Sequence, residues 1–218
     1  MEKGTTELVF ILDKSGSMSG MEEDTIGGFN SMIEKQKQLD GKVYVSTVLF
    51  SNDSEVLHDR QSLDEIKPLT TSDYVVGGCT ALLDALGSAI HHIGNVHKYA
   101  RKEDVPERTV FVITTDGMEN ASRSYSAEQV KSMVRRQQEK YGWEFLFVAA
   151  NIDAVETARN IGIRKERAAN YDVAESRSMY SEVANTLYGY RECGVIDADW
   201  ADNIEDKKKA NEAKRRNN

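Results

Sequence analysis

The stretch "LVFILDKSGS", residues 8–17, joins five apolar residues to a short run of oxygen-bearing side chains. Its apolar half is typical of a buried strand, because a strand covered on both faces has a continuous apolar sequence. The carboxylate of Asp13 and the hydroxyls of Ser15 and Ser17 then occupy every second position, and Gly16 permits a turn between them. This spacing predicts three oxygens aimed toward one point at the end of the strand.

The composition favours a folded protein without a nucleic-acid partner. The chain has 218 residues, of which 39% are hydrophobic and 29% charged, as in an ordinary globular domain. Its formal net charge is −8. Phosphate binding needs a concentrated basic surface, so this charge argues against a general nucleic-acid binder.

The sequence also predicts a cytoplasmic protein without a membrane partner. No apolar run reaches the roughly 18–20 residues of a membrane helix, and residues 1–4 are not followed by a signal-type apolar segment. The two cysteines, Cys79 and Cys193, lie far apart in the chain. A disulfide framework is therefore not expected, and a reduced compartment fits.

Apolar runs with β-favouring residues recur at 6–12, 43–50, 108–114 and 143–149, and stretches with helical spacing separate them. A further short strand is expected at 167–170, and the turn residues 51–54 predict an antiparallel edge strand from Glu55 to His58. The expected fold is α/β and Rossmann-like: a doubly wound, mainly parallel sheet with one antiparallel edge strand and helices on both faces.

Capping boxes are predicted where Ser19, Ser62 and Ser126 each stand three residues before Glu or Gln. They would open a helix that ends near Asp40-Gly41, a short helix stopped by Pro68, and a helix that reaches about Lys140. Further helices are expected at 81–97, 154–160 and 173–190. We assign residues 1–196 to one domain and residues 197–218 to a charged tail that stays solvated or frays as a helix.

Three polar loops have the composition of a cation site. Asp13, Ser15 and Ser17 follow the first strand, Thr80 precedes a helix, and Asp116 follows a central strand. In an open α/β sheet, ligands bind outside the carboxyl ends of the strands, where the strand order reverses. Hydroxyl and carboxylate oxygens suit hard cations such as Mg²⁺, although each loop by itself is also compatible with a helix cap or a turn.

Together these loops resemble the von Willebrand factor type A (VWA) family over roughly residues 5–191. Residues 13–17 match the DxSxS signature of its metal-ion-dependent adhesion site, Thr80 matches its second-loop threonine, and Asp116 in "TTDG" matches its third-loop aspartate. The stretch "FVAANIDAVETARNIGI" is similar to stand-alone bacterial and phage members. Cys79 stands where the family more usually has glycine.

The resemblance implies a metal site and a way of binding. Ser15, Ser17 and Thr80 would supply hydroxyl ligands to Mg²⁺, Mn²⁺ or Ca²⁺, while Asp13 and Asp116 would hold the metal or its waters. An open coordination position would take an Asp or Glu from a partner protein. The expected function is metal-dependent protein binding, without catalysis.

Two other classes of function stay open from the sequence. A magnesium-dependent phosphohydrolase also places an Asp after its first strand, but its second Asp is Ser15 here. The charged tail instead suggests an assembly component that docks on an acidic surface. Lys14, His91, His92 and His97 are interpreted as surface residues, and nucleophilic catalysis by Cys79 is disfavoured because no partner histidine is identifiable.

Overall fold

The computed structural model describes residues 2–216, with side chains from residue 4. One sheet has the strand order β3-β2-β1-β4-β5-β6. The strands are β1 (Glu2–Asp13), β2 (Val43–Phe50), β3 (Ser54–Ser62), β4 (Pro106–Thr115), β5 (Glu144–Ala149) and β6 (Ala168–Asn170). The β2–β3 pair is antiparallel and the other pairs are parallel, which confirms the predicted sheet.

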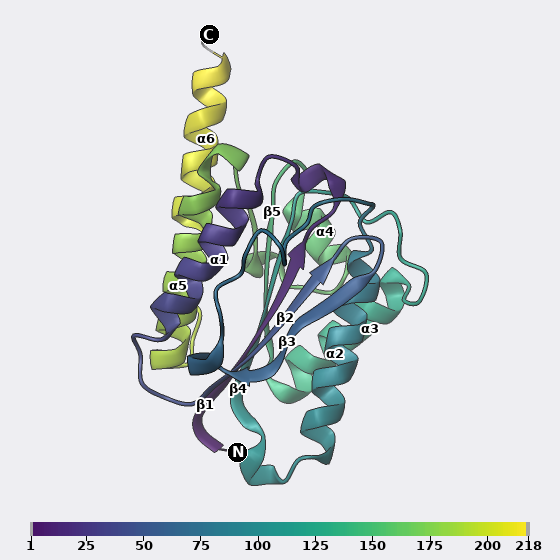
Figure 1. Cartoon of the computed structure of the whole chain (residues 1–218), viewed down its shortest axis with the longest axis vertical. Coiled ribbons are helices and arrows are strands. Elements are labelled where there is room, and N and C mark those ends of the chain that lie inside the picture. Colours follow the sequence, from purple (N-terminus) through teal and green to yellow (C-terminus); the bar gives the residue numbers. More distant parts are fainter. Residues whose placement is uncertain (1, 217–218) are drawn as a thin grey trace.

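Six α-helices surround the described sheet (Figure 1). They are α1 (Glu22–Gln36), α2 (Leu82–Tyr99), α3 (Ala127–Tyr141), α4 (Ala154–Asn160), α5 (Ser176–Cys193) and α6 (Asp202–Arg216). Short 3₁₀ turns occur at η1 (Gly16–Met18), η2 (Leu63–Glu65), η3 (Lys102–Asp104), η4 (Lys165–Arg167) and η5 (Val173–Glu175).

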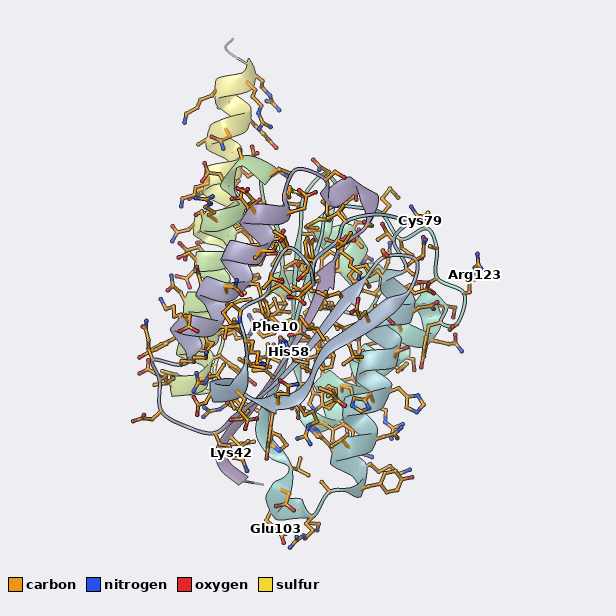
Figure 2. The ribbon with its side chains drawn as sticks, viewed as in Figure 1. Phe10, Lys42, His58, Cys79, Glu103 and Arg123 are labelled. Carbon is orange, nitrogen blue, oxygen red and sulfur yellow. The ribbon has the colours of Figure 1, made fainter. Side chains whose placement is uncertain are left out.

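The strand β1 shows why helices cover both faces of the sheet. Leu8, Phe10 and Leu12 join one apolar core with residues of α1 and α5, while Val9 and Ile11 join a second core with residues of α2, α3 and α4. All five side chains are buried, because successive residues of a strand point to opposite faces. Figure 2 shows Phe10 within the molecule and Glu103 and Cys79 toward its periphery.

Two of the three predicted capping boxes are wrong. Ser19 instead follows η1, and its hydroxyl donates to the carbonyl of Gly16, while α1 begins at Glu22 and ends at Gln36, short of Asp40. Ser62 precedes only the 3₁₀ turn η2, and within residues 2–216 no side chain caps this turn. Ser126 does form a capping box with Gln129, as predicted.

The chain beyond residue 196 begins with packed residues. Trp200, Ala201 and Ile204 are buried in the same core as α1 and α5, and Trp200 Nε1 donates to the Glu166 carbonyl at 2.8 Å. The rest of α6 is charged, and its C-terminal end projects beyond the body of the molecule (Figure 1). The domain boundary at 196/197 stays a prediction, although the first turn of α6 packs on the domain.

A buried ion-pair cluster lies toward the amino end of β1. Glu7 is fully buried, and its carboxylate accepts from Arg60 Nε at 2.6 Å and lies 2.6 Å from His97 Nε2. His97 also packs against the Trp143 ring, at 5.3 Å between centroids. The interpretation of His97 as a surface residue is therefore wrong, whereas His91 and His92 are exposed.

Candidate metal site

The first residue of the predicted site, Asp13, lies at the carboxyl end of β1 beside the end of β4. One carboxylate oxygen accepts from the Ser15 backbone N–H at 2.7 Å, and the other accepts from Thr115 Oγ1 at 2.6 Å. The Asp13 carbonyl accepts from the hydroxyl of Tyr74. Asp13 is fully buried, so these contacts fix its side chain and its backbone together.

The predicted hydroxyls gather around Gly117. Ser15 Oγ lies 3.1 Å from Ser17 Oγ, and Ser17 Oγ donates to Asp116 Oδ1 at 2.5 Å. A Cβ at position 117 would lie 3.0 Å from both Ser17 Oγ and Thr80 Oγ1, and 3.9 Å from Ser15 Oγ. The structure therefore brings Ser15, Ser17, Thr80 and Asp116 to one place, and Asp13 adjoins them through Ser15.

Backbone hydrogen bonds hold the first two loops together. Gly16 N–H donates to the Gly78 carbonyl at 3.0 Å, and Gly77 N–H donates to the Lys14 carbonyl at 2.8 Å. Gly78 has φ +82°, a left-handed conformation that glycine adopts without strain. The loop before Thr80 therefore runs alongside the loop after β1.

The third loop is held in a similar way. Thr80 N–H donates to Asn120 Oδ1 at 2.9 Å, and Asn120 N–H donates to the Thr80 carbonyl at 3.0 Å. The Glu119 carboxylate accepts from the Leu83 N–H at 2.9 Å in the first turn of α2. Asn120 thus shapes the rim of the site, and Glu119 fixes the start of a helix.

Burial governs the electrostatics of the two aspartates. Desolvation raises the pKa of Asp13 above its ordinary value, although hydrogen bonds from Ser15 and Thr115 oppose this shift. Desolvation likewise raises the pKa of Asp116, against hydrogen bonds from Ser17 and Asn151. Two carboxylates that share a buried, hydroxyl-rich place fit a hard divalent cation, whose charge would balance theirs.

The five predicted residues offer oxygen donors and no nitrogen or sulfur donor. Among the described residues, no group of three or more His, Cys, Asp or Glu side chains is placed to hold a metal ion. The five predicted residues combine two carboxylates with three hydroxyls. Oxygen ligands of this kind suit Mg²⁺, Mn²⁺ and Ca²⁺.

Lys14 and Cys79 stand near the site without entering it. Lys14 Nζ pairs with the Glu55 carboxylate at 2.7 Å, and its side chain is only 16% exposed. The positive charge of Lys14 is therefore paired within the protein. Cys79 is an exposed free thiol whose backbone N–H donates to Asn52 Oδ1 at 2.7 Å, and Cys193 is also free.

Sequence reasoning missed several residues that support the site. Tyr74 carries no local signal, because its contact with Asp13 depends on the path of the whole loop. Thr115 stands next to Asp116 at the end of the same apolar strand, so the argument that selected Asp116 could also have selected Thr115. Asn151 follows β5 with φ +56°, and its side chain acts to lower the pKa of Asp116 against the effect of burial, so its place after a strand was the available signal.

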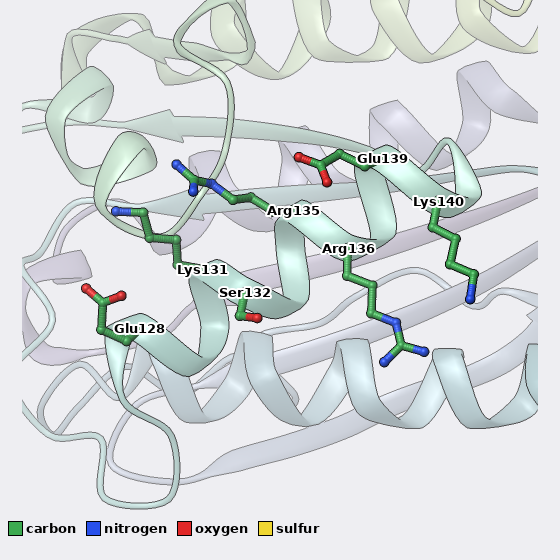
Figure 3. Close-up of a pocket in the computed structure, with 7 residues that line it drawn as sticks. All are labelled: Glu128, Lys131, Ser132, Arg135, Arg136, Glu139 and Lys140. Atoms are coloured by element: carbon green, nitrogen blue, oxygen red, sulfur yellow. The ribbon is translucent and has the colours of Figure 1, made fainter.

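A shallow hollow elsewhere on the surface contains none of the predicted residues. Figure 3 shows that its lining side chains all come from α3. They are Glu128, Lys131, Ser132, Arg135, Arg136, Glu139 and Lys140. A single charged helix face of this kind is typical of a solvated surface.

The fold and the three converging loops define a VWA domain. A family model described as "VWA domain containing CoxE-like protein" matches residues 2–179. The chain therefore belongs to the CoxE-like family of proteins that contain a VWA domain. No curated protein matches the sequence.

Solved structures with the same fold come from distant organisms. Proximal thread matrix protein 1 from the mussel byssus, with a zinc-occupied MIDAS motif, has a TM-score of 0.58 at 18% identity over 85% of this chain and 46% of its own. The ArnB paralog VWA2 from Sulfolobus acidocaldarius has a TM-score of 0.53 at 19% identity, over 84% and 45%. A von Willebrand factor type A protein from Catenulispora acidiphila has 0.54 at 12%, over 85% and 43%.

These likenesses support the fold and no more. The chain spans less than half the length of each of these solved proteins. No helix among the described residues is long and apolar enough to cross a membrane.

Proposed function

We propose that this protein binds a partner protein through a divalent cation held by Asp13, Ser15, Ser17, Thr80 and Asp116. The hydroxyls of Ser15, Ser17 and Thr80 would be ligands, and the two aspartates would hold the metal or its waters. The convergence of three hydroxyls and Asp116 around Gly117 carries the proposal. The bound metal would supply a positive charge with an open position for an Asp or Glu of the partner.

The residues around the metal would act as a rigid frame. Asp13 is held by Ser15, Thr115 and Tyr74, so its orientation is set before any ion arrives. The backbone bonds between the loops hold Thr80 against the loop after β1. Such preorganisation lowers the ordering cost of binding, while the loop surfaces would supply the specificity.

The metal itself is the first thing to measure. We expect calorimetric titration with MgCl₂, MnCl₂ or CaCl₂ to show saturable binding to the wild-type protein, and expect Asp13→Ala and Ser15→Ala to abolish it. Asp40→Ala removes an exposed carboxylate that precedes β2, at the other edge of the sheet, and should leave binding unchanged. Equal binding by all four proteins would overturn the metal site.

Partner capture is the second measurement. The immobilised protein should retain a partner in Mg²⁺ and release it in EDTA, and Asp13→Ala should retain none. Unaltered capture in EDTA would remove the proposed function. Turnover of a generic phosphomonoester that is lost on Asp13→Asn would instead favour the phosphohydrolase alternative, although Ser15 lacks the acidity of the second Asp in that class.

A further inference from the structure

Two exposed apolar side chains lie on the loops that form the candidate metal site. Among the described residues, six large apolar side chains are more than half exposed: Val56, Val75, Tyr99, Met118, Tyr141 and Val195. Met118 is 72% exposed and Val75 is 65% exposed. A single exposed apolar residue is ordinary on a protein surface, so only the position of Met118 and Val75 can indicate an interaction surface.

Met118 is one residue away from the hydroxyl cluster. Its neighbour Gly117 lies against Ser17 Oγ and Thr80 Oγ1, and Asn120 is bonded to the Thr80 backbone on the other side. Consecutive Cα atoms are about 3.8 Å apart, so the backbone of Met118 is held beside the site. Its side chain nevertheless stays in solvent.

Val75 is placed in the same manner on the second loop. The preceding residue, Tyr74, is buried and donates its hydroxyl to the Asp13 carbonyl. Two residues further on, Gly77 N–H donates to the Lys14 carbonyl at 2.8 Å. Val75 therefore stands on a segment anchored to the loop after β1 at both ends.

The contacts that hold the site also hold the chain on either side of these two residues. Both expose apolar surface on loops that are held in place, Met118 next to Gly117 and Val75 on the segment bonded to the carbonyls of Asp13 and Lys14. Apolar contacts at an interface contribute most when the loops that carry them are already ordered. Methionine in addition adapts its shape to different apolar partners.

We infer that Met118 and Val75 determine partner specificity by contacting apolar side chains next to the acidic residue that the metal binds. This inference rests on the proposed function. The partner segment is then an Asp or Glu flanked by residues such as Leu, Ile or Met.

Two short synthetic peptides test this surface. One holds a single Asp among glutamines, and the other has leucines on both sides of the same Asp. In Mg²⁺, the wild-type protein should bind the leucine-flanked peptide about tenfold more tightly, the factor expected from burying part of one leucine side chain. Met118→Gln and Val75→Thr should each lower this tenfold preference by at least roughly threefold, to about threefold or less.

Matched variants separate this contact from general damage. Met118→Leu keeps an apolar side chain and should keep the preference. Val195→Thr makes the same change as Val75→Thr at a similarly exposed valine, which follows Gly194 and lies near Arg108 at the start of β4. It should bind both peptides as the wild-type protein does.

Methyl NMR gives a second readout that does not depend on affinity. With ¹³C-methyl-labelled methionine, the Met118 signal, identified by its loss in Met118→Leu, should shift on addition of the leucine-flanked peptide in Mg²⁺. Metal-dependent binding of both peptides with no preference and an unmoved Met118 signal would overturn this inference and leave the proposed function standing. Binding that persists in EDTA with a shifted Met118 signal would support the apolar surface and remove the metal from the proposed function.

Discussion

Tyr74 illustrates how a single side chain can connect the core to the candidate site. Its ring is 2% exposed within the apolar core, and its hydroxyl reaches the carbonyl of Asp13. Burial raises the pKa of Tyr74 well above its ordinary value, so the hydroxyl stays protonated and remains a donor. The position of Asp13 is thus tied to the packing of the domain.

His58 predicts how stability depends on pH. Burial lowers the pKa of His58 below its ordinary value of 6.5, although Asp73 opposes the shift. The unfolded chain therefore takes up a proton more readily than the fold does, and stability is lost as the pH falls from about 6.5 through the lowered pKa. We expect His58→Gln to lose less stability than the wild-type protein between about pH 7 and pH 5.

The measurement is the free energy of unfolding in urea at several pH values. His91→Gln, at an exposed histidine, is the control and should follow the wild-type curve. If His58→Gln and the wild-type protein lose stability in parallel, another group governs the acid response.

At the scale of elements, alanine substitutions of two serines with similar sequence patterns should change the unfolding free energy by different amounts. Ser126 caps α3, and its hydroxyl accepts from Gln129 N–H, so Ser126→Ala should cost about 1 kcal/mol of unfolding free energy. Ser19→Ala should cost less than about 0.5 kcal/mol, because Ser19 is exposed and caps no α-helix within the described chain. Chemical denaturation of both variants checks the difference, and equal losses would contradict the assignment of the caps.

The contrast between these serines shows where sequence reasoning stops. A capping box is a local sequence pattern, and at Ser126 this pattern correctly predicts where the helix begins. At Ser19 the position of the chain is set instead by η1 and by the long-range bond from Gly16 to Gly78, and Gly20 has φ +89°. The helix therefore starts later than the local pattern indicates.

The contact between α1 and α5 depends on one glycine of a pair. A Cβ at Gly28 would lie 2.2–2.8 Å from atoms of the Tyr180 side chain, whereas a Cβ at Gly27 would meet nothing within 4 Å. Gly28→Ala should therefore destabilise the protein by about 1–3 kcal/mol. Gly27→Ala should stabilise it by up to about 1 kcal/mol, because alanine is the better helix former.

Thermal unfolding of the two variants reads out this pair directly. The melting temperature should fall for Gly28→Ala and should hold or rise for Gly27→Ala. A fall of the same size in both would mean that the helix itself, rather than its contact with Tyr180, responds to the substitution.

At the scale of the whole molecule, the converging loops were predictable and the end of the chain was not. Parallel strands place their carboxyl ends at one edge, so residues after β1 and β4 could be brought together from the strand pattern alone. The burial of Trp200 depends instead on Glu166 and on the core of α1 and α5, which no local pattern near Trp200 indicates. The buried pairing of His97 with Glu7 was missed for the same reason.

The two parts of the C-terminal segment should differ in their effect on stability. Trp200→Ala removes a buried ring and should cost about 3 kcal/mol of unfolding free energy. Deletion of residues 206–218 should cost less, about 1 kcal/mol, because none of residues 206–216 is buried, although the exposed Arg215 pairs with the buried carboxylate of Asp172 at 3.0 Å. Urea denaturation of both proteins checks this, and a large loss on deletion would mean that the charged part of α6 is structural.

The central strand β1 carries a buried acidic side chain toward each of its ends, and the two have different partners. Glu7 pairs with the guanidinium of Arg60 and also contacts His97, and the chain itself provides both partners. Among the residues that the structure describes, the donors to the Asp13 carboxylate are a hydroxyl and a backbone amide. At the amino end of β1 the protein itself thus supplies the positive charge that pairs with the buried acid. Under the proposed function, the carboxyl end takes its positive charge from a cation in solution, so occupancy of the site would depend on the concentration of that cation.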